Sequence, residues 1–341
     1  MLHQSGRLPD VVCVPYVFYI QNLVIGMYDK VAFWLERVRM GEDYTHLSRY
    51  LDGATEQTII GTGETSLFGY KDNLKVSVYN GGVHIYGSLP KFLYDGSNIF
   101  PLDVKHTAEA IEKIADTFHI KIEQATITEI EFGANFMMSH KVSEYLCKLG
   151  ELDRMQRVYF DADTLYYQGT GKKKKPKKLV FYDKIAEAKE SGMQYPSDFE
   201  DKNILRYELR LKGRISRMIG VPIIRGATLY EFPFYEKLTG IYQQHYYAIK
   251  KQNQTNNDMA EIKKPKEALE LLMARLMQQP DGQRVTSEFL KDLKERGQLD
   301  SRDFWRVKKK MEEISAKCDL SDVDELIREL DDDVNNVGAY L

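Results

Sequence analysis

The segment Ile204-Leu-Arg-Tyr-Glu-Leu-Arg-Leu211 alternates apolar and charged side chains from Leu205 onward. Successive side chains of a β-strand point to opposite faces, so the leucines and the tyrosine would share one face. Arg206, Glu208 and Arg210 would then lie together on the other face. The pattern predicts a strand that packs on one side and carries charge on the other.

Comparable strand patterns recur over the first 250 residues, at 28–35, 74–79, 83–89, 125–135, 156–167 and 179–182. Asn80-Gly81-Gly82 separates two of them and suits a hairpin turn, because these residues tolerate positive φ. Asp103 can cap a helix whose apolar residues recur every three or four positions as far as Phe118. This mixture predicts an α+β fold with a largely antiparallel central sheet and flanking helices.

The composition changes near residue 251. Residues 251–265 are polar and rich in Asn and Lys, which is typical of a linker. Residues 266–341 show helical patterns and no strand pattern, so we expect a small helical accessory domain there. The main domain is then expected at 27–250, preceded by an extension of unclear role at 1–26.

The overall charge is modest, at −3 over 341 residues, but basic residues concentrate between 172 and 217. A local basic zone in a nearly neutral chain indicates one surface that faces phosphate. The three cysteines are widely scattered and suggest neither a disulfide framework nor a zinc site. No stretch is long and apolar enough for a membrane span, and a cytoplasmic location is expected.

The basic zone leads into the apolar segment Leu179-Val-Phe-Tyr-Asp-Lys184. A strand that ends in Tyr-Asp-Lys after a block of positive charge could combine a hydroxyl nucleophile, a metal ligand and a phosphate-binding surface. The alternative is an ordinary strand tyrosine beside a solvated lysine loop. The candidate DNA-binding residues are the basic side chains of this region, Lys172, Lys173, Lys174, Lys175, Lys177, Lys178, Arg206 and Arg210.

Two glutamates, Glu129 and Glu131, would project from one face of a strand about 7 Å apart. Such a pair repels unless cations separate the carboxylates, and Mg²⁺ or Mn²⁺ prefers carboxylate oxygens. A salt-bridged strand edge is the alternative. For Glu208, which lies between two arginines in the sequence, structural ion pairing is the leading interpretation from the residues alone.

Two common kinds of site are absent from the sequence. None of the seven histidines lies two residues from another, so the His-hydrophobic-His metal motif of one large class of nicking enzymes is missing. No Gly-x-Ser-x-Gly motif or cysteine–histidine signature indicates acyl hydrolysis.

Several short motifs, taken in order, resemble those of replication initiators of the filamentous-phage gene II type. They begin with His84-Ile-Tyr-Gly-Ser-Leu-Pro-Lys-Phe92 and Gly96-Ser-Asn98, and continue with Ile127-Thr-Glu-Ile-Glu131 and Asn135. Thr164-Leu-Tyr-Tyr-Gln-Gly169, Leu179–Lys184 with Glu187, and Leu205-Arg-Tyr-Glu-Leu209 complete the series. The resemblance covers about residues 27–250 and extends distantly to the initiators of staphylococcal rolling-circle plasmids.

This resemblance implies a metal-dependent enzyme that nicks one strand at an origin and later rejoins it. Tyr182 matches the nucleophile, which would form a 5′-phosphotyrosine and release a 3′-hydroxyl primer. Glu131 matches the metal ligand of the central strand, Asp183 the acid beside the tyrosine, and Glu208 the glutamate of the Arg-x-Glu strand. Lys184 is expected to help stabilise the phenolate and the phosphoryl charge. The implied cofactor is Mg²⁺ or Mn²⁺, and the implied partners are origin DNA with a host helicase and polymerase.

Two departures from the family pattern are visible, one at Glu129 and one at Gln168-Gly169-Thr170, which replaces the Gly-Ser expected after the two tyrosines. Glu129 stands where the phage branch is usually basic, so it is either an additional ligand or one half of an exchanged salt bridge. Adjacent Tyr182 and Asp183 would also face opposite ways in a regular strand and could share a site only at a bulge or at a junction with a helix beginning near Ile185. A non-catalytic, sequence-specific DNA-binding protein of a phage or plasmid remains the alternative function.

Overall fold

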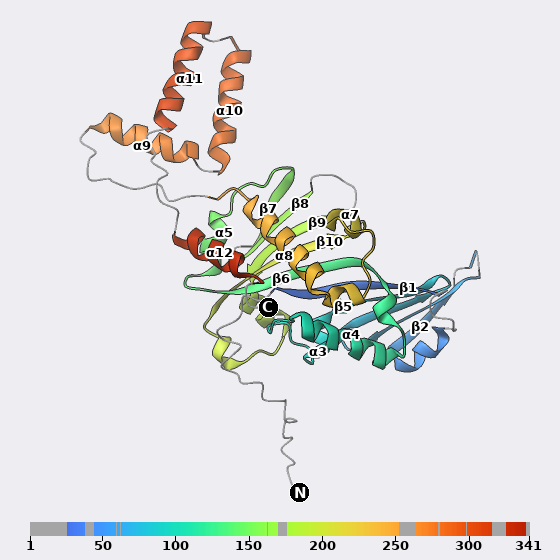
Figure 1. Cartoon of the computed structure of the whole chain (residues 1–341). Helices are drawn as coiled ribbons and strands as arrows, with labels where there is room; N and C mark the ends of the chain where they lie inside the picture. The colour runs from blue at the N-terminus through green and yellow to red at the C-terminus, as the bar shows by residue number, and fades with distance from the viewer. Residues whose placement is uncertain are drawn as a thin grey trace.

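A computed structural model describes residues 26–37, 44–58, 60–61, 63–161, 163–169, 176–251, 264–278, 280–297, 299–315 and 325–338. Its central feature is a ten-stranded sheet in the order β2-β3-β4-β5-β1-β6-β10-β9-β8-β7 (Figure 1). Every neighbouring pair of strands is antiparallel. The predicted α+β class with a largely antiparallel central sheet is therefore confirmed.

The ten strands are β1 (Met27–Glu36), β2 (Asp52–Thr58), β3 (Thr65–Lys71), β4 (Leu74–Tyr79), β5 (Gly82–Ser88), β6 (Thr126–Met138), β7 (Met155–Asp161), β8 (Thr164–Gly169), β9 (Lys177–Asp183) and β10 (Asn203–Lys212). The α-helices are α3 (Leu89–Leu93), α4 (Val104–Phe118), α5 (Val142–Lys148), α6 (Lys184–Ser191), α7 (Ile215–Ile219), α8 (Phe232–Tyr247), α9 (Pro265–Gln278), α10 (Pro280–Glu295), α11 (Ser301–Ser315) and α12 (Glu325–Asn336). Four short 3₁₀ helices are η1 (Tyr44–Tyr50), η2 (Ile122–Gln124), η3 (Ser197–Phe199) and η4 (Ala227–Tyr230).

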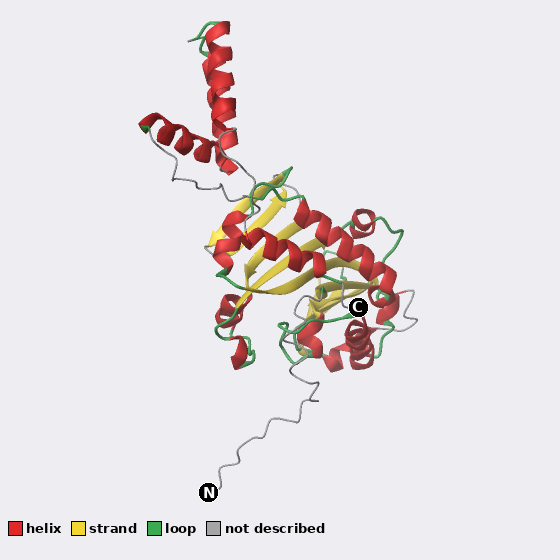
Figure 2. Cartoon of the chain, turned by 60° about the vertical axis from the view of Figure 1, so that its left-hand side comes forward, coloured by secondary structure: helices red, strands yellow, loops and turns green. Residues whose placement is uncertain are grey.

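One face of the sheet is covered by helices, among them α4 and α8 (Figures 1 and 2). The alternation of β10 explains this arrangement, because Tyr207 and its apolar neighbours point toward α8. The Tyr207 ring stacks between Phe181 of β9 and Tyr242 of α8, with centroid separations of 4.3 and 4.2 Å. The charged side chains of β10 consequently lie on the opposite face, which carries the site described below.

Two details of the strand prediction differ. The pattern over 156–167 forms two strands, β7 and β8, because the Asp161 carboxylate accepts a hydrogen bond from the Asp163 amide and closes a turn between them. Strands β2 and β3 were not predicted. All of β2 is exposed, so its side chains have no apolar alternation to reveal it.

The C-terminal helices have two different surroundings. α9, α10 and α11 contact one another, around a small buried cluster of Ala274 and Ile314. α12 instead packs against α5, α8 and β6, and its Leu330 and Val334 join the main core. The structure therefore differs from a single accessory domain over 266–341, because helical periodicity marks an apolar face but does not identify what covers it. The N-terminal extension and most of the linker lie outside the described residues.

Within the ranges described above, no helix is long and apolar enough to cross a membrane.

Candidate active site

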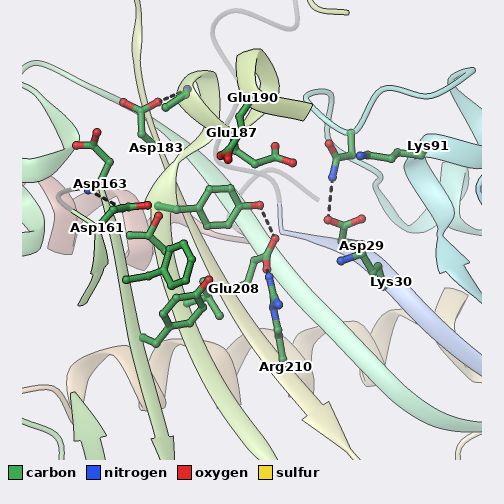
Figure 3. A pocket seen from close by; sticks show the side chains of 17 residues that line it. Asp29, Lys30, Lys91, Asp161, Asp163, Asp183, Glu187, Glu190, Glu208 and Arg210 are labelled. Atoms are coloured by element: carbon green, nitrogen blue, oxygen red, sulfur yellow. Dashed lines mark hydrogen bonds and ion pairs between the residues drawn. The ribbon is translucent and has the colours of Figure 1, made fainter. Parts of the chain in front are cut away.

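Tyr182 lies near the end of β9, one residue before the strand gives way to α6. It is paired with Arg206 of β10 on one side and with Thr164 of β8 on the other. Because Phe181 points into the helix-covered core, Tyr182 points to the opposite, charged face of the sheet. Its hydroxyl donates a hydrogen bond to Glu208 Oε1 at 2.8 Å (Figure 3).

Glu208 is held between two arginines of its own strand. Arg206 Nε donates to Oε1 at 2.6 Å, and Arg210 donates to Oε2 from Nη2 at 2.6 Å and from Nε at 2.9 Å. Burial opposes ionisation of this carboxyl, but the two guanidinium groups outweigh it and hold its pKa well below the usual range. The structural ion pairing expected for Glu208 is therefore present, and Tyr182 contacts the same carboxylate.

Arg206 is fully buried and its donors are used inside the protein. Nη2 donates to Asp29 Oδ2 at 2.7 Å and Nη1 to Asn135 Oδ1 at 3.0 Å. Arg206 was a candidate DNA contact, but this geometry makes it the internal counter-ion of Asp29 and Glu208. No DNA phosphate can reach it without breaking these pairs.

Asp29 was missed by the sequence reasoning. It lies on β1, is buried, and receives hydrogen bonds from Ser88 and Asn98 as well as Arg206. A single acid within the apolar run of β1 was the available signal. Ser88 of the Gly-Ser motif and Asn98, which belong to the family-like motifs, hold Asp29 in place.

Tyr182 is a protonated phenol at neutral pH in this arrangement. Burial raises its pKa well above the ordinary value, and the negative charge of Glu208 raises it further. Catalysis by this tyrosine would therefore require a change in its surroundings when substrate binds.

Glu131 is only 4% exposed and lies near Lys30, whose Nζ is 3.3 Å from Oε2, and Arg210, whose Nε is 3.6 Å from Oε1. Its Oε2 accepts no hydrogen bond. Burial raises the pKa of Glu131 to about 7, and the charge of Glu208 adds to the effect. Glu129 forms an ion pair with Lys212 at 2.6 Å, as in the salt-bridge interpretation.

Asp183 and Lys184 occupy the junction of β9 and α6. Asp183 Oδ1 caps the helix by accepting hydrogen bonds from the amides of Ile185 and Ala186. Lys184 is buried, and its Nζ donates to Asn98 Oδ1 at 2.8 Å and to Glu187 Oε2 at 2.6 Å. That Nζ lies 5.9 Å from the centre of the Tyr182 ring, so Lys184 contacts the ring of the tyrosine and not its hydroxyl partner Glu208.

The four predicted metal ligands do not come together. Asp183 caps a helix, Glu129 pairs with Lys212, and Glu208 is saturated by arginine. Among the described side chains, no group of three or more His, Cys, Asp or Glu could hold a metal ion. As arranged, these residues do not fit a carboxylate metal centre, and the buried Oε2 of Glu131 accepts no hydrogen bond.

The predicted DNA-binding lysines differ in where they lie. Lys172, Lys173, Lys174 and Lys175 lie outside the described residues. Lys177 turns to the helix-covered face, where its Nζ is 3.3 Å from Nε2 of His245 on α8. Its neighbour Lys178 lies on the open face, with Nζ 3.7 Å from the centre of the Tyr166 ring.

A cleft of about 530 Å³ opens beside Tyr182, a size within the range of ligand sites. Lys30, Lys91 and Arg210 line it with positive charge. Asp161 and Asp163 lie across the cleft from Lys30 and Lys91, and Glu187 and Glu190 of α6 form another part of the rim (Figure 3). The aromatic lining comes from Tyr182, Phe160 and Tyr166.

A comparison with known protein families identifies the family of the chain. A family model, Phage_CRI, described as the N-terminal region of a replication-associated protein of the phage gene II type, matches residues 27–230. This match covers more than half of the chain, and the chain belongs to that family. Its role is therefore that of a replication initiator.

Among solved structures, the chain is similar to a rolling circle replication initiator protein from Geobacillus stearothermophilus. The two share 13% sequence identity with a TM-score of 0.37, over 71% of this chain and 91% of the other. No curated protein matches the chain significantly.

Proposed function

We propose that the protein is a site-specific nickase and strand transferase in which Tyr182 attacks one phosphodiester of the origin. The tyrosine oxygen gives up its proton to Glu208 and forms a bond to phosphorus. The bond from phosphorus to the 3′ oxygen breaks, and that oxygen leaves as a hydroxyl with the proton that the tyrosine released. The products are a 5′-phosphotyrosine and a free 3′-hydroxyl. Reversal of the same steps rejoins the strand, because the phosphotyrosine linkage conserves the energy of the broken phosphodiester bond.

The observation that carries the proposal is the position of the Tyr182 hydroxyl. It lies at a cleft beside Glu208 and Arg210, with two lysines on the facing wall. Arg210, whose side chain is 29% exposed, can bind a non-bridging phosphate oxygen and stabilise charge that develops on it. Lys30 and Lys91 would hold the neighbouring backbone.

The same arrangement suggests how the tyrosine is activated. Glu208 is a weak base while both arginines bind it. A phosphate that draws Arg210 away removes one of these cations, so the pKa of Glu208 rises and the carboxylate becomes a better acceptor for the Tyr182 proton. In this scheme substrate binding itself switches on the nucleophile.

Dependence on Mg²⁺ or Mn²⁺ remains part of the proposal because the family resemblance implies it. Glu131, whose Oε2 is buried and accepts no hydrogen bond, is the carboxylate to test for it. The 3′-hydroxyl would be extended by a host polymerase after a host helicase opens the duplex, in the cytoplasm of the host.

The decisive test uses supercoiled plasmid that carries the cognate origin, incubated with Mg²⁺ or Mn²⁺. The native chain should convert it to open circles with protein attached to a 5′ end, whereas Tyr182→Phe should bind without converting it. Tyr166→Phe, the other tyrosine of the cleft, is the matched control and should remain active. Retardation without conversion by the native chain would favour the non-catalytic DNA-binding alternative.

A further inference from the structure

Phe160 is an unusually placed aromatic residue. It lies near the end of β7 and is 79% exposed, although its ring contacts another ring. The centroids of Phe160 and Tyr166 are 6.4 Å apart with the ring planes at 90°, an edge-to-face pair. Isolated exposed apolar residues are common on protein surfaces. This pair differs because both rings line the cleft of Tyr182.

The strand register places the pair at a defined distance from the nucleophile. Thr164 of β8 lies opposite Tyr182, and Tyr166 lies opposite Val180. Tyr166 is therefore a diagonal neighbour of Tyr182 on the same face, about 7–8 Å away along the sheet. Lys178 Nζ lies 3.7 Å from the centre of the Tyr166 ring, a cation–π contact that holds the ring in place.

The charge around the rings selects which part of a nucleotide they can receive. Asp161 and Asp163 follow Phe160 where β7 turns into β8, and such carboxylates repel a phosphate. Lys30 and Lys91 lie on the far side of the cleft and attract one (Figure 3). A nucleotide in this cleft would therefore place its phosphate at the lysines, away from Asp161, Asp163 and the rim glutamates Glu187 and Glu190, and its base toward the aromatic pair.

We infer that Phe160 and Tyr166 form a stacking platform for an unpaired base next to the scissile phosphate. The inference rests on the proposed function for the location of that phosphate. Aromatic side chains stack on any base through its π-face, so the platform would grip a single strand without reading its sequence. It would also hold the strand unpaired at the point of attack, where a duplex would keep its bases stacked inside.

The test uses the full chain with the Tyr182→Phe substitution, so that no cleavage is needed. The probe is a set of twelve-nucleotide oligothymidylates, each with one 2-aminopurine, whose fluorescence falls when it stacks. Binding should quench the probe, and Phe160→Ala should abolish most of the quench and weaken affinity about 5- to 100-fold. Phe160→Tyr should restore both.

Two controls separate stacking from other roles. Phe232→Ala removes an aromatic side chain of 46% exposure that does not line the cleft, and it should leave quench and affinity unchanged. The slope of log affinity against log salt should be the same for Phe160→Ala and its parent, since stacking releases no counterions. The thermal unfolding temperatures of Phe160→Ala and Phe232→Ala should match that of the parent, because the side chains of Phe160 and Phe232 are exposed.

The platform is overturned if the probe is not bound or not quenched, or if Phe160→Ala behaves like Phe232→Ala. These outcomes differ from a failure of the proposed function. If Phe160→Ala abolishes the quench while Tyr182→Phe still nicks DNA, the stacking platform is supported and Tyr182 is not the nucleophile. If nicking requires Tyr182 but Phe160→Ala leaves the quench unchanged, Tyr182 is the nucleophile and the stacking platform is wrong.

Discussion

The two faces of β10 differ in chemistry although they alternate along one strand. On the covered face Tyr207 stacks between Phe181 and Tyr242 in an apolar layer. On the open face Arg206 and Glu208 are equally buried, but they are charged and paired. Apolar burial stabilises a fold directly, whereas a buried ion pair often contributes little because both charges lose their hydration.

This difference indicates what each face is for. A chain under selection for stability alone could replace the buried ions by apolar residues of similar volume. The ions of the open face instead hold Glu208 against the Tyr182 hydroxyl and leave Arg210 at the cleft. We therefore expect substitutions on the covered face to change stability, and those on the open face to change activity as well.

The largest effect on activity is expected for Tyr182→Phe. The variant loses the attacking oxygen, so covalent attachment and nicking should disappear. It also loses one hydrogen bond to a charged group, which should lower the free energy of unfolding by only about 1–3 kcal/mol. Gel analysis of protein–DNA adducts and urea unfolding measure the two quantities. A normal adduct yield would assign the nucleophile elsewhere, with Tyr166 as the other cleft tyrosine, since Tyr167 is fully buried.

Arg206→Met on the open face and Phe181→Ala on the covered face compare the two faces of the sheet directly. Each should lower the free energy of unfolding by about 3–5 kcal/mol, the first by leaving two carboxylates unpaired and the second by opening a cavity. At a temperature where both remain folded, Arg206→Met should have lost nicking and Phe181→Ala should retain it. Equal loss of nicking in both folded variants would mean that the network of the open face has no role beyond stability.

Glu131→Gln tests the carboxylate with a raised pKa. The folded protein keeps a proton on Glu131 up to about pH 7, whereas the unfolded chain releases it near pH 4.5. Native stability therefore falls as the pH rises through this window, by about 1–3 kcal/mol, and the glutamine variant should lack this loss. It should be the more stable protein at pH 8, with no advantage below pH 4.5, as measured by urea unfolding at each pH.

Glu131→Gln also tests whether Glu131 is a metal ligand or only a buried carboxyl group with a raised pKa. If Glu131 binds Mg²⁺ or Mn²⁺, either ion should stabilise the native chain at pH 8 but not Glu131→Gln, and nicking should be lost. Glu129→Gln is the matched control, because Glu129 is already paired with Lys212. Normal nicking by Glu131→Gln at low metal concentration would remove Glu131 from any metal site.

The smallest effect per residue is expected for neutralising Lys172 to Lys175. Affinity should fall about equally for origin and random DNA, because phosphate contacts carry no base information. Each lost contact should reduce the slope of log affinity against log salt by about 0.7–0.9. The rate at saturating DNA should hardly change. An unaltered salt slope would support the solvated-loop interpretation of the lysine run.

The sequence by itself determined most of the elements, although not β2 and β3, and it determined which side chains share a face. Alternation over Leu205–Leu211 separated the stacked tyrosine from the charged residues. The pattern around residues 179–185 predicted a junction of strand and helix at Tyr182 and Asp183. These features are local, because strand and helix periods and capping residues act over a few neighbours. The ordered motifs also placed the chain in its family, and the family match confirmed that placement.

Only the tertiary structure decided which partner each charged group has. Asp29 meets Arg206 across 177 residues of sequence, Glu129 meets Lys212, and Asp183 turns its carboxylate to its own helix. α12 likewise returns to the sheet instead of joining the neighbouring helices. Periodicity states which face a side chain occupies, but the order and register of distant strands select its neighbours, and in a buried site those neighbours set charge, pKa and chemistry.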